Sequence, residues 1–200
     1  AVRPQDGVDV LTYEVSLTVS PDDAMQGGSG RMALAGTARL RVRHAPDTGA
    51  LVLRFEEPEQ LKALRVNDAP VEAVREGDLL RVPLPSDTLS TVEVGYVVLA
   101  ERNDGLYVEE ARGQTVTLTD SQFLRGASWL PADHHPADPA TLRLTVTAPD
   151  SLEAVASGAL VVDTLVMMMS SEVNGASSIR AHGAVWTVAS MAGMAPSEYA

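Results

Sequence analysis

The stretch that decides the fold is TARLRVRH, residues 37–44. Its small and apolar residues alternate with arginines: Ala38, Leu40 and Val42 against Arg39, Arg41 and Arg43. Successive side chains of a β-strand point to opposite faces, so a period of two predicts a strand with one buried and one solvated face.

The same period recurs along most of the chain. It is clear in TLRLTVTAP (141–149) and in DVLTYEVSLTVS (9–20), where it slips near Tyr13. Further strands are expected at 50–56, 60–67, 78–84, 91–100, 114–120, 158–169 and 184–191. Turn signals rich in Gly, Pro, Asn and Asp separate these segments. Strands spaced roughly every 8–12 residues predict an all-β sandwich or a related multi-sheet form.

Two connections carry more specific expectations. Residues 60–84 have the pattern of a β-meander with tight turns. The polar, Gly/Ser-rich stretch SSEVNGASSIRAHG (170–183) is expected to be a long, mobile hairpin loop. No amphipathic helix and no linker is apparent, so residues 1–200 are expected to form a single β domain.

Composition limits the partners and the chemistry. The net charge is −12, from 27 acidic and 15 basic residues, which disfavours nucleic acid and anionic membranes but suits a cationic ligand such as a peptide amino terminus. There is no cysteine, which excludes thiolate chemistry and disulfides. No run reaches the ~18 apolar residues that a membrane span needs. The compartment stays open between the cytoplasm and export.

Catalytic and metal-binding motifs are missing from these 200 residues. There is no HExxH zinc motif and no G-x-S-x-G nucleophile elbow. GGSGR (27–31) lacks the lysine of a P-loop, and His44 and His182 have no evident partner in the sequence. His134 and His135 are adjacent, so on a strand they would point to opposite faces. We therefore assign no catalytic residue and no metal ligand to this chain.

The region around these two histidines resembles a known family. WLPADHHPADPATLRLTVTAPDSLEAVASG (129–158) is similar to the N-terminal domain of zinc aminopeptidases related to aminopeptidase N and leukotriene A4 hydrolase. The matching positions are Trp129, Leu130, Pro131, Pro136, Ala140, Leu142, Pro149, Ala156, Ser157 and Gly158. In this light PADHHPADPA is a turn braced by prolines, which fix φ and block helix formation.

Other blocks agree with the resemblance in the right order. The segment from Val10 to Arg43 resembles the family's opening strands, and residues 51–85 resemble its second block. NDGLYVEE (103–110) resembles its GLY segment, and AVWTVASMAGMAPSEYA (184–200) resembles its closing pattern. The resemblance covers nearly the whole chain, and it implies a large, multi-stranded, saddle-like β-sandwich of mostly antiparallel strands.

The resemblance also implies one functional position. The family's N-terminal domain carries a Gln-x-Glu or Gln-x-Gln segment that helps to hold the substrate's free α-amine. An ungapped count back from Trp129 puts this anchor at Gln122, with Asp120 at the weaker, earlier position. Matching SQF to the family's TQF instead puts it at Leu124, which could not bind an amine. The arginine common after this segment is absent, although Arg125 is nearby.

Two functions from different classes remain. The resemblance implies a non-catalytic domain that covers the active-site groove of a zinc aminopeptidase-like hydrolase. Its partners would be a catalytic domain beyond Ala200, which would hold the zinc, and the amino terminus of a peptide substrate. A face left bare by that domain could also drive homo-oligomers. The alternative is a free-standing β-sandwich that serves binding or assembly without enzymatic activity.

Overall fold

The computed structural model describes residues 5–21, 32–56, 58, 60–100, 105–111, 114–119, 122–133, 135, 139–148, 153–157, 159–161, 168–173, 176–182 and 185–189. Beyond residue 148 it describes the backbone alone. The described elements are strands and one short 3-10 helix. No helix among these residues is both long enough and apolar enough to cross a lipid bilayer.

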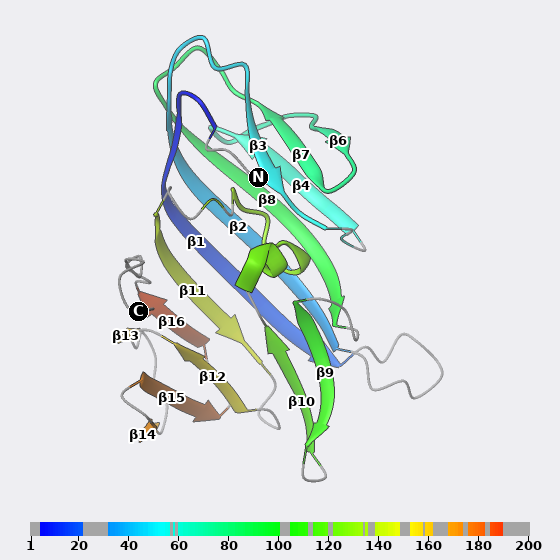
Figure 1. Ribbon diagram of the computed structural model, residues 1–200, viewed down its shortest axis with the longest axis vertical. Coiled ribbons are helices and arrows are strands. Elements are labelled where there is room, and N and C mark those ends of the chain that lie inside the picture. Colours follow the sequence, from blue (N-terminus) through cyan, green and yellow to red (C-terminus); the bar gives the residue numbers. More distant parts are fainter. Residues whose placement is uncertain are drawn as a thin grey trace, which may run out of the picture.

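A long, twisted eight-stranded sheet organises the molecule (Figure 1). In spatial order its strands are β13 (Ala159–Val161), β16 (Val185–Ala189), β11 (Thr141–Thr147), β1 (Val8–Pro21), β2 (Met32–His44), β8 (Leu89–Ala100), β4 (Gln60–Val66) and β5 (Ala69–Pro70). β1 and β11 pair in parallel, and all other described pairs are antiparallel.

Three smaller sheets complete the described fold. They are β3 (Ala50–Arg54) with β7 (Leu79–Pro83) and β6 (Val74–Glu76); the hairpin of β9 (Leu106–Ala111) and β10 (Gln114–Thr119); and β12 (Glu153–Ser157) with β15 (Ala176–His182) and β14 (Met168–Val173). The first of these packs on the inner face of the long sheet. The expected all-β sandwich of mostly antiparallel strands is therefore confirmed.

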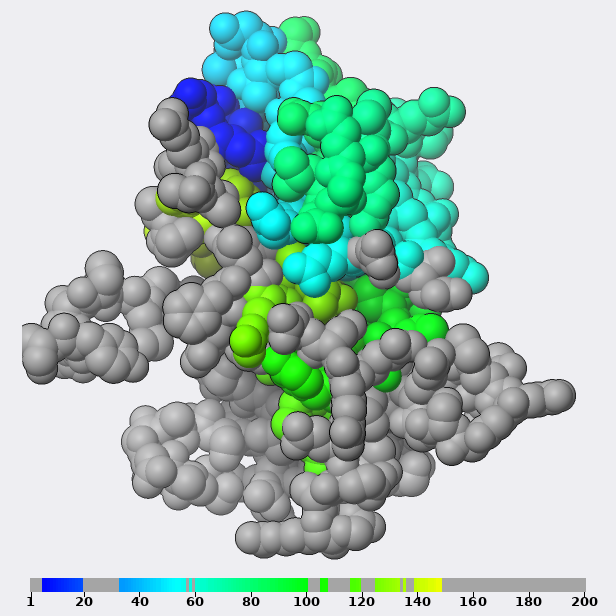
Figure 2. All heavy atoms as spheres, turned by 45° about the vertical axis from the view of Figure 1, so that its right-hand side comes forward, coloured from blue at the N-terminus to red at the C-terminus, as the bar shows by residue number. Residues whose placement is uncertain are grey.

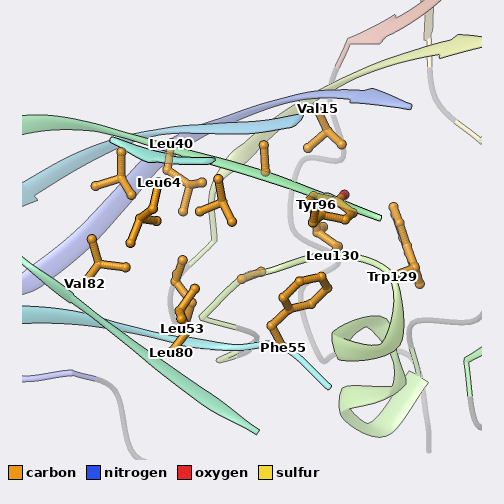
Figure 3. Close-up of a cluster of buried hydrophobic side chains, with 14 of the residues drawn as sticks. Val15, Leu40, Leu53, Phe55, Leu64, Leu80, Val82, Tyr96, Trp129 and Leu130 are labelled. Atoms are coloured by element: carbon orange, nitrogen blue, oxygen red, sulfur yellow. The ribbon is translucent and has the colours of Figure 1, made fainter. Parts of the chain in front are cut away.

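Alternation places the core as the sequence predicts. On β2, Ala38, Leu40 and Val42 are fully buried, while the arginines between them are exposed. The buried residues of β2 share a core with Leu53, Leu80 and Val82 of the small sheet and with Phe55, which follows β3 (Figure 3). The sandwich is closed by this contact between two inner faces.

The irregularity near Tyr13 is a β-bulge. The pairing of β1 with β2 shifts register between Val10 and Thr12. Val10 and Val15 are both buried, at 0% and 1% exposure, although their odd spacing would send them to opposite faces of a regular strand. The extra residue of the bulge returns both to the core.

The outer face of the long sheet carries a row of alternating charges. Cross-strand partners align Arg143, Glu14, Arg39, Glu93 and Arg65 on β11, β1, β2, β8 and β4. Directly opposed residues lie on the same face, so each acidic residue stands between two arginines. A shift of the central pairing by one residue would break both this row and the buried alternation beneath it.

The meander expected at 60–84 is wrong in one respect. β4 and β5 form a hairpin whose turn residues Asn67 and Asp68 have φ of 49° and 65°, as a type I′ turn requires. β6 then pairs with β7 in the small sheet rather than in the long one. The chain thus changes sheets between Pro70 and Val74, because the two layers of a sandwich must be connected somewhere.

Two expectations for the C-terminal quarter are also corrected. The stretch 170–183 is a paired hairpin rather than a long loop, because β14 pairs with β15 and β15 pairs with β12. The single strand expected at 158–169 is instead β13 followed, from Met168, by β14. Residues 162–167 lie outside the described residues. Of the two strands in the stretch 170–183, β15 is paired on both sides, and β14 is the edge strand of the sheet.

Candidate functional site

The candidate site lies in the connector, residues 122–133, which follows β10. It begins with the 3-10 helix η1 (Gln122–Ser128) and continues through Trp129 to Asp133. Figure 1 shows η1 lying across β1 and β2, close to the hairpin of β9 and β10. Sequence reasoning did not predict this helix, since seven residues are too few to show a period.

The structure places Gln122 as the first residue of η1. Leu124, the alternative anchor, belongs to the same helix. The side chains of both residues lie outside the described part of the structure. Asp120, the weaker candidate, lies outside the described residues.

Backbone hydrogen bonds tie the connector to β3 and to the residues after it. Arg54 and Ala132 exchange two bonds, with N···O distances of 2.8 and 3.2 Å. The Glu56 N–H donates to the Ala127 carbonyl at 2.8 Å. The connector therefore follows the free edge of the small sheet like an interrupted strand.

Side chains fix the connector to the core. Ala127, Trp129, Leu130 and Ala132 are each 8% exposed or less. In Figure 3, Trp129 and Leu130 reach from the end of η1 toward Tyr96 and Phe55. Burying a tryptophan and a leucine contributes several kcal/mol together, at about 1.5–3 kcal/mol for each large apolar side chain.

The start of β9 touches the helix from the other side. Gly105 has φ of +125°, and a Cβ there would overlap the Arg125 carbonyl and the Ser128 hydroxyl. The Arg125 guanidinium (Nη1) donates to the Tyr107 hydroxyl at 3.2 Å, and the Ser128 hydroxyl donates to the Arg125 carbonyl at 2.9 Å. Figure 2 shows yellow-green atoms of this region between the small sheet and the green hairpin.

The histidine pair that follows the connector shows no metal-site geometry among the described residues. Asp133 is 8% exposed, and its backbone N–H donates to the Tyr13 hydroxyl at 3.2 Å. His135 is half-buried, whereas His134 and Asp138 lie outside the described residues. Within the described part of the chain, no three His, Cys, Asp or Glu side chains come together as metal ligands would. The side chain of His182 is not described.

The sequence did not predict the hydrogen-bonded pair of His44 and Ser90. His44, which has no evident partner in the sequence, is buried, and its Nε2 lies 2.9 Å from the Ser90 hydroxyl, which is also buried. Its Nδ1 lies 3.2 Å from the Ala45 carbonyl, which can only accept, so Nδ1 carries the proton. The pair joins β2 to β8 and lies away from the connector. No local signal could link residues so far apart in the sequence.

Comparison with solved structures gives the wider context. An M1 zinc metallopeptidase from Deinococcus radiodurans (E323A mutant) superposes with a TM-score of 0.58 at 23% identity, over 92% of this chain and 42% of that one. Native yeast LTA4 hydrolase superposes with a TM-score of 0.66 at 14% identity, over 95% of this chain and 30% of that one. No protein-family model and no curated protein matches the sequence.

These likenesses establish the fold. The chain has the architecture of a region of M1 zinc metallopeptidases and LTA4 hydrolase, as the sequence resemblance implies. It spans 42% of the length of the Deinococcus enzyme, and 43% of the length of a two-domain M1 zinc metallopeptidase (E323A mutant) bound to L-arginine. What the remainder of such a protein would do is therefore a matter for proposal.

Proposed function

We propose that this chain is the non-catalytic N-terminal domain of a zinc-dependent aminopeptidase-like protein. One observation carries the proposal: the fold matches these enzymes over 92% of the chain, yet accounts for 42% of the enzyme's length. The order of the family-like sequence blocks supports the same assignment. In this proposal the domain covers the active-site groove, and residues 1–200 form one unit of a longer polypeptide.

The domain's contribution is to hold the substrate's amino terminus. An ammonium group has three donors and no acceptor, so it needs acceptor oxygens. The amide oxygen of Gln122 can supply one, and the carboxylate of Asp120 a second. The net charge of −12 favours approach of a cationic amino terminus. A connector held by backbone bonds and buried side chains would keep such an anchor in a fixed place.

Zinc belongs to the partner domain in this proposal. A zinc ion in that domain would polarise the scissile carbonyl and activate a water molecule. The described residues of this chain gather no ligand set for it. In this proposal the chain binds and orients the substrate, and the isolated chain is expected to cleave nothing.

The first test is the reading frame beyond the codon for Ala200. An HExxH motif within the next ~150 residues, about one further domain, would support the proposal. A stop codon directly after Ala200 would contradict it and favour a free-standing β-sandwich that binds a partner.

The second test is Gln122→Ala in the full-length protein, assayed with leucine 4-nitroanilide. Loss of a hydrogen bond to a charged amine is expected to raise KM about tenfold, or more, with kcat less affected. Gln60→Ala is the matched control, because Gln60 is an exposed glutamine on β4. An unchanged KM for Gln122→Ala would contradict the anchor, and a change in Leu124→Ala alone would transfer the role to that position.

A further inference from the structure

We infer that Tyr107 is a positioning residue for the substrate-anchoring helix, acting through its hydrogen bond with Arg125. The inference rests on the proposed function, and it adds residues from β9 that neither the sequence resemblance nor the comparisons assign to substrate binding. It concerns which contacts fix the rotational orientation of helix η1 about its own axis.

The helix is short and therefore depends on outside contacts. Its seven residues make little more than two turns, and 3-10 hydrogen bonds are weaker than those of an α-helix. The hydrogen bond from Glu56 to Ala127 and the buried residues from Trp129 onward fix its C-terminal end.

The Tyr107–Arg125 contact adds a constraint nearer the start of the helix. Positions three apart in a 3-10 helix lie one above the other, so positions 122 and 125 share a face. Arg125 is bound at its Nη1 by the Tyr107 hydroxyl, at 3.2 Å. A contact that fixes the facing of position 125 also fixes the facing of position 122.

Neighbouring residues make Tyr107 a rigid partner. Leu106, directly before it, is fully buried. Gly105 contacts the far end of the helix so closely that no side chain would fit between it and the Arg125 carbonyl. The triplet Gly105–Leu106–Tyr107 thus touches the helix at two points, one at the backbone and one at the arginine side chain.

The test is Tyr107→Phe in the full-length protein, which keeps the ring and removes the hydroxyl. We expect KM for leucine 4-nitroanilide to rise roughly threefold to tenfold, with kcat within about twofold of the parent. Tyr96→Phe is the matched control, because the Tyr96 hydroxyl is buried and has no hydrogen-bond partner. That control should leave KM unchanged.

A double-mutant cycle separates positioning from a general loss of structure. If Tyr107 acts through the anchor, Tyr107→Phe should add nothing to the KM of Gln122→Ala. Inhibition by L-leucine, compared with 4-methylpentanoic acid, which lacks the amine, should weaken in Tyr107→Phe only for the amine-bearing compound.

The outcomes distinguish this inference from the function beneath it. If Gln122→Ala raises KM while Tyr107→Phe behaves like Tyr96→Phe, the positioning role is wrong and the anchor stands. Additive effects in the double mutant, or equal weakening for both inhibitors, would also overturn the positioning role. If Gln122→Ala itself has no effect, the anchor fails, and the positioning role fails with it.

Discussion

The centre of the long sheet and the connector share one hydrophobic core, but different interactions place them. β2 and β8 pair along their length, and their alternating sequence decides which side chains turn inward. The connector has no such repeat and is held by contacts with β3, β9 and the core. The local sequence pattern determines the conformation of the strands. The conformation of the connector depends on contacts with strands that are already in place.

Glycine substitutions should separate the two regions most strongly. At Gly36 of β2, an added Cβ would meet the buried ring of Tyr96, and no positive φ adds backbone strain there. At Gly105 it would meet backbone, and its φ of +125° disfavours any other residue. We expect Gly105→Ala to reduce the free energy of unfolding by about 4 kcal/mol and Gly36→Ala by about 2 kcal/mol, in urea titrations. The reverse order would mean that β9 does not rest against η1.

Truncation of one leucine in each region tests whether the core is shared. Leu40 and Leu130 are 0% and 8% exposed. We expect Leu40→Ala and Leu130→Ala each to lower the free energy of unfolding by about 3 kcal/mol, because each leaves a cavity. If the connector were a surface loop, Leu130→Ala would cost under about 1 kcal/mol, as surface changes usually do.

The smallest expected effect concerns pH and the residue where the two regions meet. Tyr96 packs edge-on against Phe55, with ring centroids 5.0 Å apart, and burial raises the pKa of its phenol. The unfolded chain therefore releases this proton first, so the contribution to stability is complete below pH ~10 and is lost as pH rises further.

The loss should reach at most about 1.4 kcal/mol per pH unit for this single group. Alkaline urea titrations of the parent and of Tyr96→Phe would measure it, since only the parent carries the titrating phenol. At neutral pH we expect Tyr96→Phe to be no less stable, because the lost hydroxyl has no hydrogen-bond partner. Identical slopes for both proteins would show that Tyr96 is not the group responsible.

The strands were predictable because burial leaves a period of two in the sequence. The stretch 37–44, the slip near Tyr13 and the turn at Asn67 and Asp68 all correspond to structural features. The change of sheet after Pro70 was not predictable, since both layers use the same alternation. Nor was the β14–β15 hairpin, whose polar strands depend on pairing rather than on an apolar pattern.

The site was predictable only through resemblance. The family-like motifs point to Gln122. No periodic pattern in the sequence predicts helix η1, and none predicts its contact with Tyr107. The His44–Ser90 pair was missed for the same reason, because its members meet only when β2 and β8 pair. Contacts between residues distant in sequence have no local signal.

The N-terminal segment has a consequence for how the domain behaves in a crowded solution. The side-chain amide of Gln5 bonds both backbone groups of Val52, at 2.6 and 2.7 Å. Two residues further along, Arg54 is bonded to Ala132. The outer side of β3 therefore offers no free row of donors and acceptors for another chain to extend. At Val52, Gln5 takes the backbone hydrogen bonds that a fourth strand would use, and this disfavours edge-to-edge association.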